Sequence, residues 1–415
     1  MINPYWELLI LLCLINVIFA ISLNLILGYN GQFSLGHAGF LAVGAYASGV
    51  ITVQLAAATG GIALWHLGVG ILAAILFSII AAAAIGYPCL RLRGDYLAIA
   101  TLGFAEIIRI VLLALPKDVF GGPTGMKAVY SFRYYLAPPE AAGGPAAFGS
   151  LNGIGNLVFT VLFSLVLAAV AVWGVWALAN ALQRVLGRLL RFSYWRWVVI
   201  VLVAAVLAAF WKPVMAAMLD VFQYSERFSP DSLGSNQWLV FAVFVMLVAL
   251  VTWLTRNYLN SLPGRAAIAI REDEIAATTL GINCSWMKLQ NFMLGCALAG
   301  LAGALTAHTL SLFRPLDFNF FKSVDVLLMV VLGGMGSVTG SYLGAFLITV
   351  LPEVLRFLGQ WRLVIYSLVL ILFMIFRPGG LLGSAEIGDL IRLRISRLAR
   401  GSQAAPSAGG GGGDA

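Results

Sequence analysis

The sequence predicts an all-α, polytopic bundle of transmembrane helices, and three observations lead to that fold class. Hydrophobic residues make up 61% of the 415 residues, whereas charged residues make up only 10%. The mean hydropathy is +0.97. No Asp, Glu, Lys or Arg lies between Glu7 and Arg91, and about 20 apolar residues in a helix already span the hydrocarbon core. Continuous apolar runs differ from the alternating strands of about ten residues in a membrane β-barrel, and they exclude an ordinary water-soluble enzyme.

Eleven apolar segments are predicted to cross the membrane, with ten as the alternative count. The first, 8–27, follows no basic region and contains no small-residue cleavage site, so we expect a retained span rather than a signal peptide. The others are 36–56, 67–88, 96–115, 157–182, 197–219, 237–255, 289–310, 323–336, 338–355 and 363–377. The short segment 323–336 could instead be re-entrant.

The positions of Lys and Arg predict an external N-terminus and a cytoplasmic C-terminus, because basic residues are retained on the cytoplasmic side. We therefore expect one transmembrane domain over 1–385, in which 256–288 forms a cytoplasmic loop. The remaining residues, 386–415, are predicted to be a cytoplasmic tail that is basic and rich in Gly.

The sequence lacks the common motifs of reactive or energy-converting sites. The four cysteines show neither a CxxC pair nor a Cys/His metal spacing, and no G-x-x-x-x-G-K-[ST] phosphate loop, H-E-x-x-H pair or G-x-S-x-G elbow occurs. The net charge of +8 comes largely from Arg clusters beside apolar runs, which indicates membrane topology rather than nucleic-acid binding. We therefore expect a membrane protein in contact with lipid that is not itself an enzyme and holds no cofactor or metal.

A cluster of glycines and uncharged polar residues at 28–40 separates the first two predicted spans. Glycine permits broken helices and a close approach of the backbone, so polar side chains here could line a path for a polar solute. The candidate pathway residues in this segment are Asn30, Gln32, Ser34 and His37. The alternative is a tight turn between two helices that is packed by its glycines.

Ionisable residues inside the predicted spans are rare. Glu106 lies in the middle of 96–115, with Arg109 three residues later on the same helical face. Glu106 is a further candidate for the pathway, and the alternative is a neutralising structural pair. A proton-driven carrier usually contains chains of Asp, Glu or His within its spans, and the sequence has no such chain.

The predicted loop 256–288 contains two short helical patterns. One covers 264–271, and the other covers 272–280 with Glu272, Asp273 and Glu274 in its first turn, where negative charge suits the helix end. Gly281 suits the C-terminal end of the second helix, because glycine is common directly after a helix. Two short helices with both signs of charge would form a docking surface, whereas the alternative is a solvated connector.

Seven segments in this order resemble the inner-membrane permease subunit of branched-chain amino-acid ABC importers, the larger of the two permease types. They are GYNGQFSLGHAGFLAVGAYASG at 28–49, LRLRGDYLAIATLGFAEIIRIV at 90–111, GGPTG at 121–125, GRAAIAIREDEIAATTLGIN at 264–283, KLQNFMLGCALAGLAGALTAH at 288–308, VVLGGMGSVTGSYLGA at 330–345 and RPGGLLG at 377–383. Segment 150–225 departs from the shorter relatives, and we expect a two-span insertion there.

The resemblance implies a type II-like importer permease in the bacterial inner membrane that works by alternating access. It implies a second related permease, a soluble solute-binding protein and two ATP-binding subunits that use ATP and magnesium. The family's E-A-A-x-x-x-G coupling pattern aligns with Ile275, Ala276, Ala277 and Gly281, so that Ile275 replaces the leading Glu. The residues expected to couple this chain to the ATPases are Arg271, Glu272, Asp273, Glu274, Ala277 and Gly281.

The resemblance favours leucine, isoleucine and valine as the solutes. Urea and short-amide importers have similar permeases and remain the first alternative. A proton-coupled secondary transporter is the alternative from another class, and a scaffold that does not transport is a further one.

Overall fold

The structure is a computed structural model, and it describes residues 4–59, 64–90, 92, 94–126, 237–310, 312–377 and 379–383. Helices dominate these residues, and the β-structure found among them is one isolated bridge between Met126 and Phe313. The predicted spans 157–182 and 197–219, the predicted insertion 150–225 and the predicted tail 386–415 lie outside the described residues.

Seven helices in the described part of the chain are long and apolar enough to cross a membrane. These helices are α1 (Pro4–Leu27), α2 (His37–Thr59), α3 (Leu64–Cys89), α4 (Asp95–Ala114), α9 (Gln237–Asn260), α12 (Cys284–Leu310) and α14 (Val338–Val354). The 3₁₀-helix Leu355–Trp361 continues α14. Two shorter apolar helices are α13 (Phe320–Gly333) and α15 (Arg362–Phe376). The fold class and nine of the predicted segments are thus confirmed as helices. α13 and α15 have 14 and 15 residues and reach only about 21 to 23 Å.

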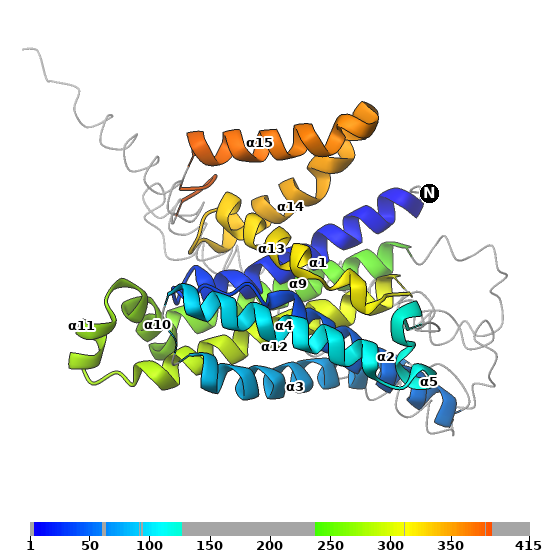
Figure 1. Cartoon of the computed structure of the whole chain (residues 1–415), viewed down its shortest axis with the longest axis horizontal. Coiled ribbons are helices and arrows are strands. Elements are labelled where there is room, and N and C mark those ends of the chain that lie inside the picture. Colours follow the sequence, from blue (N-terminus) through cyan, green and yellow to red (C-terminus); the bar gives the residue numbers. More distant parts are fainter. Residues whose placement is uncertain are drawn as a thin grey trace, which may run out of the picture.

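The two ends of the bundle are distinct (Figure 1). The short helices α10 (Leu262–Glu272) and α11 (Glu274–Thr279) lie at one end, whereas the N-terminus and α5 (Lys117–Phe120) lie at the other. Backbone hydrogen bonds join segment 377–383 to the C-terminal end of α13, which lies near α10. The last described residues of the chain therefore lie at the same end of the bundle as α10 and α11. This arrangement agrees with the predicted opposite sides for the N-terminus and the loop 256–288.

Close contact between α2 and α12 forms the centre of the bundle. A methyl group on Gly44 would lie 2.2 Å from the carbonyl oxygen of Gly300, and one on Gly303 would lie 2.1 Å from the carbonyl oxygen of Leu41. Lipid provides no hydrophobic drive between helices, so small residues that let backbones touch are a main source of association. α1 lies across this pair and packs on α12 and α14.

Aromatic side chains fill the bundle between its centre and the end that carries the N-terminus. The ring of Tyr46, nine residues into α2, meets the ring of Phe313 edge-on at 4.9 Å, and Phe313 meets Phe318 at 6.1 Å. Met126, which directly follows the GGPTG motif, joins these rings, because its N–H donates to the carbonyl of Phe313 at 3.0 Å. We call Tyr46, Phe313, Phe318 and Met126 the aromatic plug.

Candidate coupling site

Helices α10 and α11 form a two-helix unit, which we call the coupling unit. Asp273 separates them, because it adopts an extended conformation with φ of −155° and caps α11. Its Oδ1 accepts hydrogen bonds from the N–H groups of Ile275 at 2.8 Å and Ala276 at 3.1 Å. The expectation that Glu272 begins the second helix is therefore wrong: Glu272 is the last residue of α10, since the chain must break at Asp273 to form the cap.

Gly281 ends the coupling unit through its backbone conformation. Its φ is +82°, and a methyl group there would meet no atom within 4 Å. A larger side chain at this position is therefore opposed by backbone strain rather than by lack of space. A residue other than Gly in the left-handed backbone conformation costs about 1 to 2 kcal/mol, and Asn is among the best tolerated.

In the importer that the sequence resemblance implies, we expect Gly281→Val to lower solute uptake several-fold, whereas Gly281→Asn keeps most of the uptake. The two side chains are similar in size, so the comparison separates strain from bulk. Initial uptake rates at equal amounts of membrane-inserted protein would measure this difference. Equal losses for Val and Asn would contradict the explanation by strain.

A small core of its own holds the coupling unit together. Ile270, Ala277 and Cys284 are buried against one another beside Ile282 and Met287. Ala277 is only 1% exposed, so this expected coupling residue serves to pack α11 rather than to present a contact surface.

An ion pair joins the coupling unit to the start of α12. The carboxylate of Glu274 lies 2.8 Å from Nζ of Lys288. Both side chains are partly exposed, so the contribution to stability is modest. Lys288 was not among the residues expected from the sequence to take part, because its partner could be recognised only after the turn at Gly281 had been placed.

The outer surface of the coupling unit is apolar as well as acidic. Ile275 is 78% exposed and Leu280 is 79% exposed, on α11 and just after it. Glu272 and Asp273 are exposed nearby. Large aliphatic side chains held out at the end of a bundle, among charged residues, are typical of a surface that docks another protein.

Arg271 turns inward and connects α10 to the transmembrane helices. Its Nη1 donates a hydrogen bond to the carbonyl of Gly28, directly after the end of α1. A methyl group on Gly31 would lie 3.2 Å from Arg271 Cγ, and one on Gly336 would lie 2.9 Å from its Nη1. A cation at the C-terminal end of a helix interacts favourably with the helix dipole. Of the expected coupling residues, Arg271 thus contacts the end of α1, whereas Glu274 contacts α12 through Lys288.

Asn24 extends this connection from α1 to the turn between α13 and α14. Its Nδ2 donates to the carbonyl of Ser337 at 2.8 Å and to Oγ of Ser341 at 2.9 Å. Its Oδ1 accepts from the N–H of Gly336 at 2.9 Å. The sequence analysis missed Asn24, although an amide within an uncharged span is itself a signal, because it needs a partner inside the bundle.

The segment 377–383 joins the same place. The N–H groups of Leu381 and Leu382 donate to the carbonyls of Leu332 and Gly333, at 2.8 and 3.2 Å, and so cap the end of α13. Three Gly-containing segments thus meet through close backbone contacts, the first two of them beside Arg271, and we call them the glycine junction: 28–36, 333–341 and 377–383.

The candidate pathway residues do not all come together. Asn30, Gln32 and Ser34 lie in the turn between α1 and α2, beside the coupling unit, and all three are buried. His37 begins α2, where its Nε2 lies 2.7 Å from Oγ of Ser22. Glu106 lies apart from them, about 17 Å along α4 from its start, and forms the predicted pair with Arg109.

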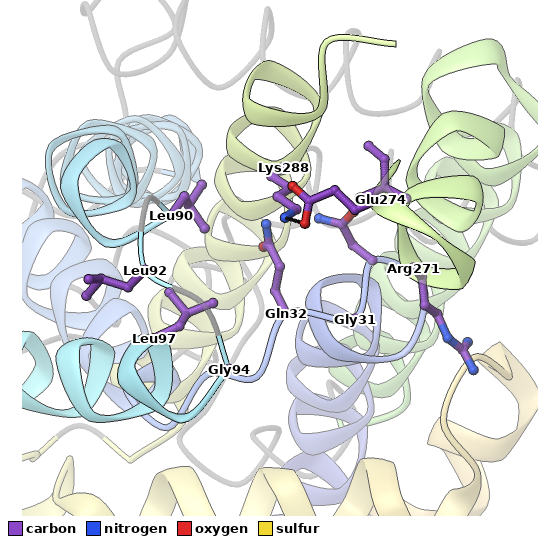
Figure 2. A pocket seen from close by; sticks show the side chains of 11 residues that line it. Gly31, Gln32, Leu90, Leu92, Gly94, Leu97, Arg271, Glu274 and Lys288 are labelled. Carbon is purple, nitrogen blue, oxygen red and sulfur yellow. Dashed lines mark ion pairs between the residues drawn. The ribbon is translucent and has the colours of Figure 1, made fainter. Parts of the chain in front are cut away.

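A hollow of about 210 Å³ separates the turn between α1 and α2 from the coupling unit (Figure 2). Its polar lining comes from Asn30, Gln32, Arg271, Glu274 and Lys288, and its apolar lining from Leu90, Leu92, Leu97 and Ile270. Figure 2 shows that Gln32 points towards the Glu274–Lys288 pair, whereas the guanidinium of Arg271 extends away from it.

The bundle of membrane-length helices, tied to a two-helix unit at one end, is that of a multi-pass membrane protein. The chain belongs to the family of branched-chain amino acid transport system permease components, whose pattern matches residues 7–137 and 139–377. This confirms the family that the seven motifs indicate.

Several curated relatives are similar to this chain. The high-affinity branched-chain amino acid transport system permease protein LivM of Escherichia coli (strain K12) is 31% identical over 89% of this chain and 68% of its own length. The permease protein LivH of the same organism is 29% identical over 40% of this chain and 53% of its own length. The probable branched-chain amino acid transport permease protein LivM of Methanocaldococcus jannaschii is 26% identical over 38% of this chain and 52% of its own length. No solved structure matches the chain.

Proposed function

We propose that this chain is the membrane-spanning permease subunit of an ATP-binding-cassette importer that translocates leucine, isoleucine and valine. The observation that carries the proposal is the coupling unit, which exposes the apolar side chains of Ile275 and Leu280 and is joined to the end of α1 by the hydrogen bond from Arg271 to Gly28. The names of the relatives supply the solute class, because they are branched-chain amino acid permeases.

The proposed assembly contains a second related permease, two ATP-binding subunits and a soluble solute-binding protein. The ATP-binding subunits dock on the coupling unit and bind ATP and magnesium, so this chain needs neither an ATPase site nor a cofactor. The assembly lies in the bacterial inner membrane, with the coupling unit in the cytoplasm. Residues 1–385 form the permease domain, 150–225 add two spans to it, and 386–415 form the cytoplasmic tail.

The contacts suggest how ATP-driven closure becomes movement in the membrane. Displacement of α10 pulls on the end of α1 through Arg271, and Asn24 passes the displacement to the turn between α13 and α14. Rocking of these helices against the tightly packed α2–α12 pair opens the solute path to one side at a time.

Reconstitution of the complete importer in proteoliposomes tests the proposal. We expect uptake of L-leucine that requires ATP and the binding protein, and no uptake by this chain alone under a pH gradient. Uptake of urea or acetamide in place of L-leucine would support the alternative solute class. Uptake driven by the pH gradient alone would overturn the proposal.

Replacement of the exposed apolar side chains tests the docking surface. Burial of an aliphatic side chain contributes about 1.5 to 3 kcal/mol, so Ile275→Asp or Leu280→Asp should weaken the association with the ATP-binding subunits at least about tenfold. The ATPase that co-purifies with the permease in detergent measures this association.

Asn283→Asp is the matched control. It also adds a negative charge at an exposed position, and a carboxylate can still accept the hydrogen bond from the N–H of Trp286 at 3.1 Å. We expect co-purification to remain close to wild type. Equal retention of ATPase by Ile275→Asp and Asn283→Asp would show that the ATPases dock elsewhere.

A further inference from the structure

The hollow between the turn after α1 and the coupling unit contains buried polar atoms without partners. Asn30 is 2% exposed and Gln32 is 4% exposed. Neither the oxygen nor the nitrogen of either side-chain amide has a hydrogen-bond partner. Buried amides are nearly always hydrogen bonded, to protein or to water, so four such atoms beside one hollow indicate a place for water or for a polar ligand.

The charges around the hollow indicate what kind of polar group that is. Lys288 and Glu274 supply one positive and one negative charge, held 2.8 Å apart, and Gln32 points towards them (Figure 2). The guanidinium of Arg271 is directed away, towards Gly28. Among the described lining residues whose charged groups face the hollow, the charges are therefore balanced. A balanced pair with neutral amides suits a solute that carries both an ammonium and a carboxylate group, whereas a phosphate site would have an excess of donors and positive charge.

The other side of the hollow is aliphatic. Leu90, Leu92, Leu97 and Ile270 line it. Its volume of about 210 Å³ is large enough for several water molecules or for one small solute. One wall therefore suits a branched hydrocarbon chain, and the other suits the two charged groups of an amino acid.

The geometry points to a binding site for a free aliphatic α-amino acid at the coupling-unit end of the permease, where a bound molecule restrains the coupling unit. The occupant bridges Asn30 and Gln32 in the turn after α1 to Glu274 and Lys288, which lie on α11 and α12. It thus resists the displacement of α10 and α11 that drives transport. Accumulated solute on this side therefore slows its own import, and this regulatory part rests on the proposed function, whereas the binding part does not.

Direct binding is measured on the complex of permeases and ATP-binding subunits in lipid nanodiscs, without the solute-binding protein. We expect saturable binding of radiolabelled L-leucine. Binding should weaken at least tenfold in Gln32→Leu, which removes an amide from the hollow, and in Leu97→Trp, which fills it. Gln54→Leu is the matched control, because it makes the same chemical change at an exposed position towards the other end of α2. Two outcomes would contradict the assignment of the site: weaker binding in Gln54→Leu as well, or unchanged binding in all three variants.

Competitors of defined charge test the chemistry of the site. Isovalerate lacks the ammonium group and isopentylamine lacks the carboxylate, so both should compete at least tenfold less well than unlabelled L-isoleucine. Inorganic phosphate should not compete. Displacement by phosphate, or by isovalerate as strongly as by L-isoleucine, would indicate an anion site and overturn the assignment.

Sided ATPase measurements test the regulation. The complete importer is reconstituted with its ATP-binding subunits facing the bath and with binding protein and L-leucine enclosed. L-leucine added to the bath should lower ATP hydrolysis and L-leucine transport at least twofold in the wild type and in Gln54→Leu, but not in Gln32→Leu. Normal transport without inhibition would overturn the regulatory inference and leave the proposed function intact. Binding without any transport of L-leucine would instead contradict the proposed function.

Discussion

The substitution Gly300→Leu is expected to prevent the bundle from folding, with almost no permease surviving extraction in mild detergent. A methyl group on Gly300 would lie 2.2 Å from Oγ of Ser78 and 2.8 Å from the carbonyl oxygen of Ala74, so α12 would have to move away from α3. The carbonyl of Gly300 already lies 2.2 Å from the Cβ position of Gly44 on α2. Overpacking of a close-packed core costs about 1 to 3 kcal/mol even when side chains can yield, and here backbone and short side chains block the space.

Gly103→Leu provides the control for this effect. Gly103 lies in the middle of α4, is exposed, and has no atom within 4 Å of its Cβ position. The same change should leave the yield of folded protein and its thermal transition in detergent within error of the wild type. Similar yields for the two variants would show that the α2–α3–α12 contact does not determine folding.

The substitution Arg271→Met is expected to uncouple the transporter. The variant keeps the length of the side chain but loses the hydrogen bond from the guanidinium to Gly28. Hydrogen bonds that involve a charged group contribute about 1.5 to 3 kcal/mol, so the link between α10 and α1 should weaken by one to two orders of magnitude. ATP hydrolysis by the complete importer should persist, whereas solute uptake per ATP hydrolysed should fall at least about tenfold.

Arg265→Met tests whether any arginine on α10 has this effect. Arg265 is exposed, and its guanidinium donates to the carbonyl of Asn260 within the adjoining turn, at 3.0 and 3.3 Å. Its loss should change the ratio of uptake to hydrolysis less than about twofold. Equal uncoupling by both substitutions would indicate a general effect of charge at the membrane surface and would contradict a specific role for Arg271.

The helices could be predicted from the sequence because each is encoded locally. Apolar length identified α1 to α4, and the polar, Gly-bounded loop identified the coupling unit. The error at Glu272 also has a local origin. Three successive acidic residues all suit a first helical turn, and only the extended backbone of Asp273 reveals which of them is the cap.

The connections of the candidate site could not be predicted, because they join distant parts of the chain. Asn24 and Ser337 are 313 positions apart, and Arg271 and Gly28 are 243 positions apart. No periodicity encodes such pairs. The segments of the glycine junction were recognised singly as motifs, and their meeting depends on how the helices pack.

The aromatic plug has a consequence for how the proposed importer opens at the end of the bundle that carries the N-terminus. Its cohesion comes from a few edge-on ring contacts, each contributing about 0.5 to 1.5 kcal/mol, and from one backbone hydrogen bond of about 1 kcal/mol. All four side chains are also buried, and burial of each large apolar side chain contributes about 1.5 to 3 kcal/mol, so the plug is a stable part of the fold. In the proposed importer, any opening of the solute path at this end has to separate these side chains, so it requires a source of free energy outside this chain.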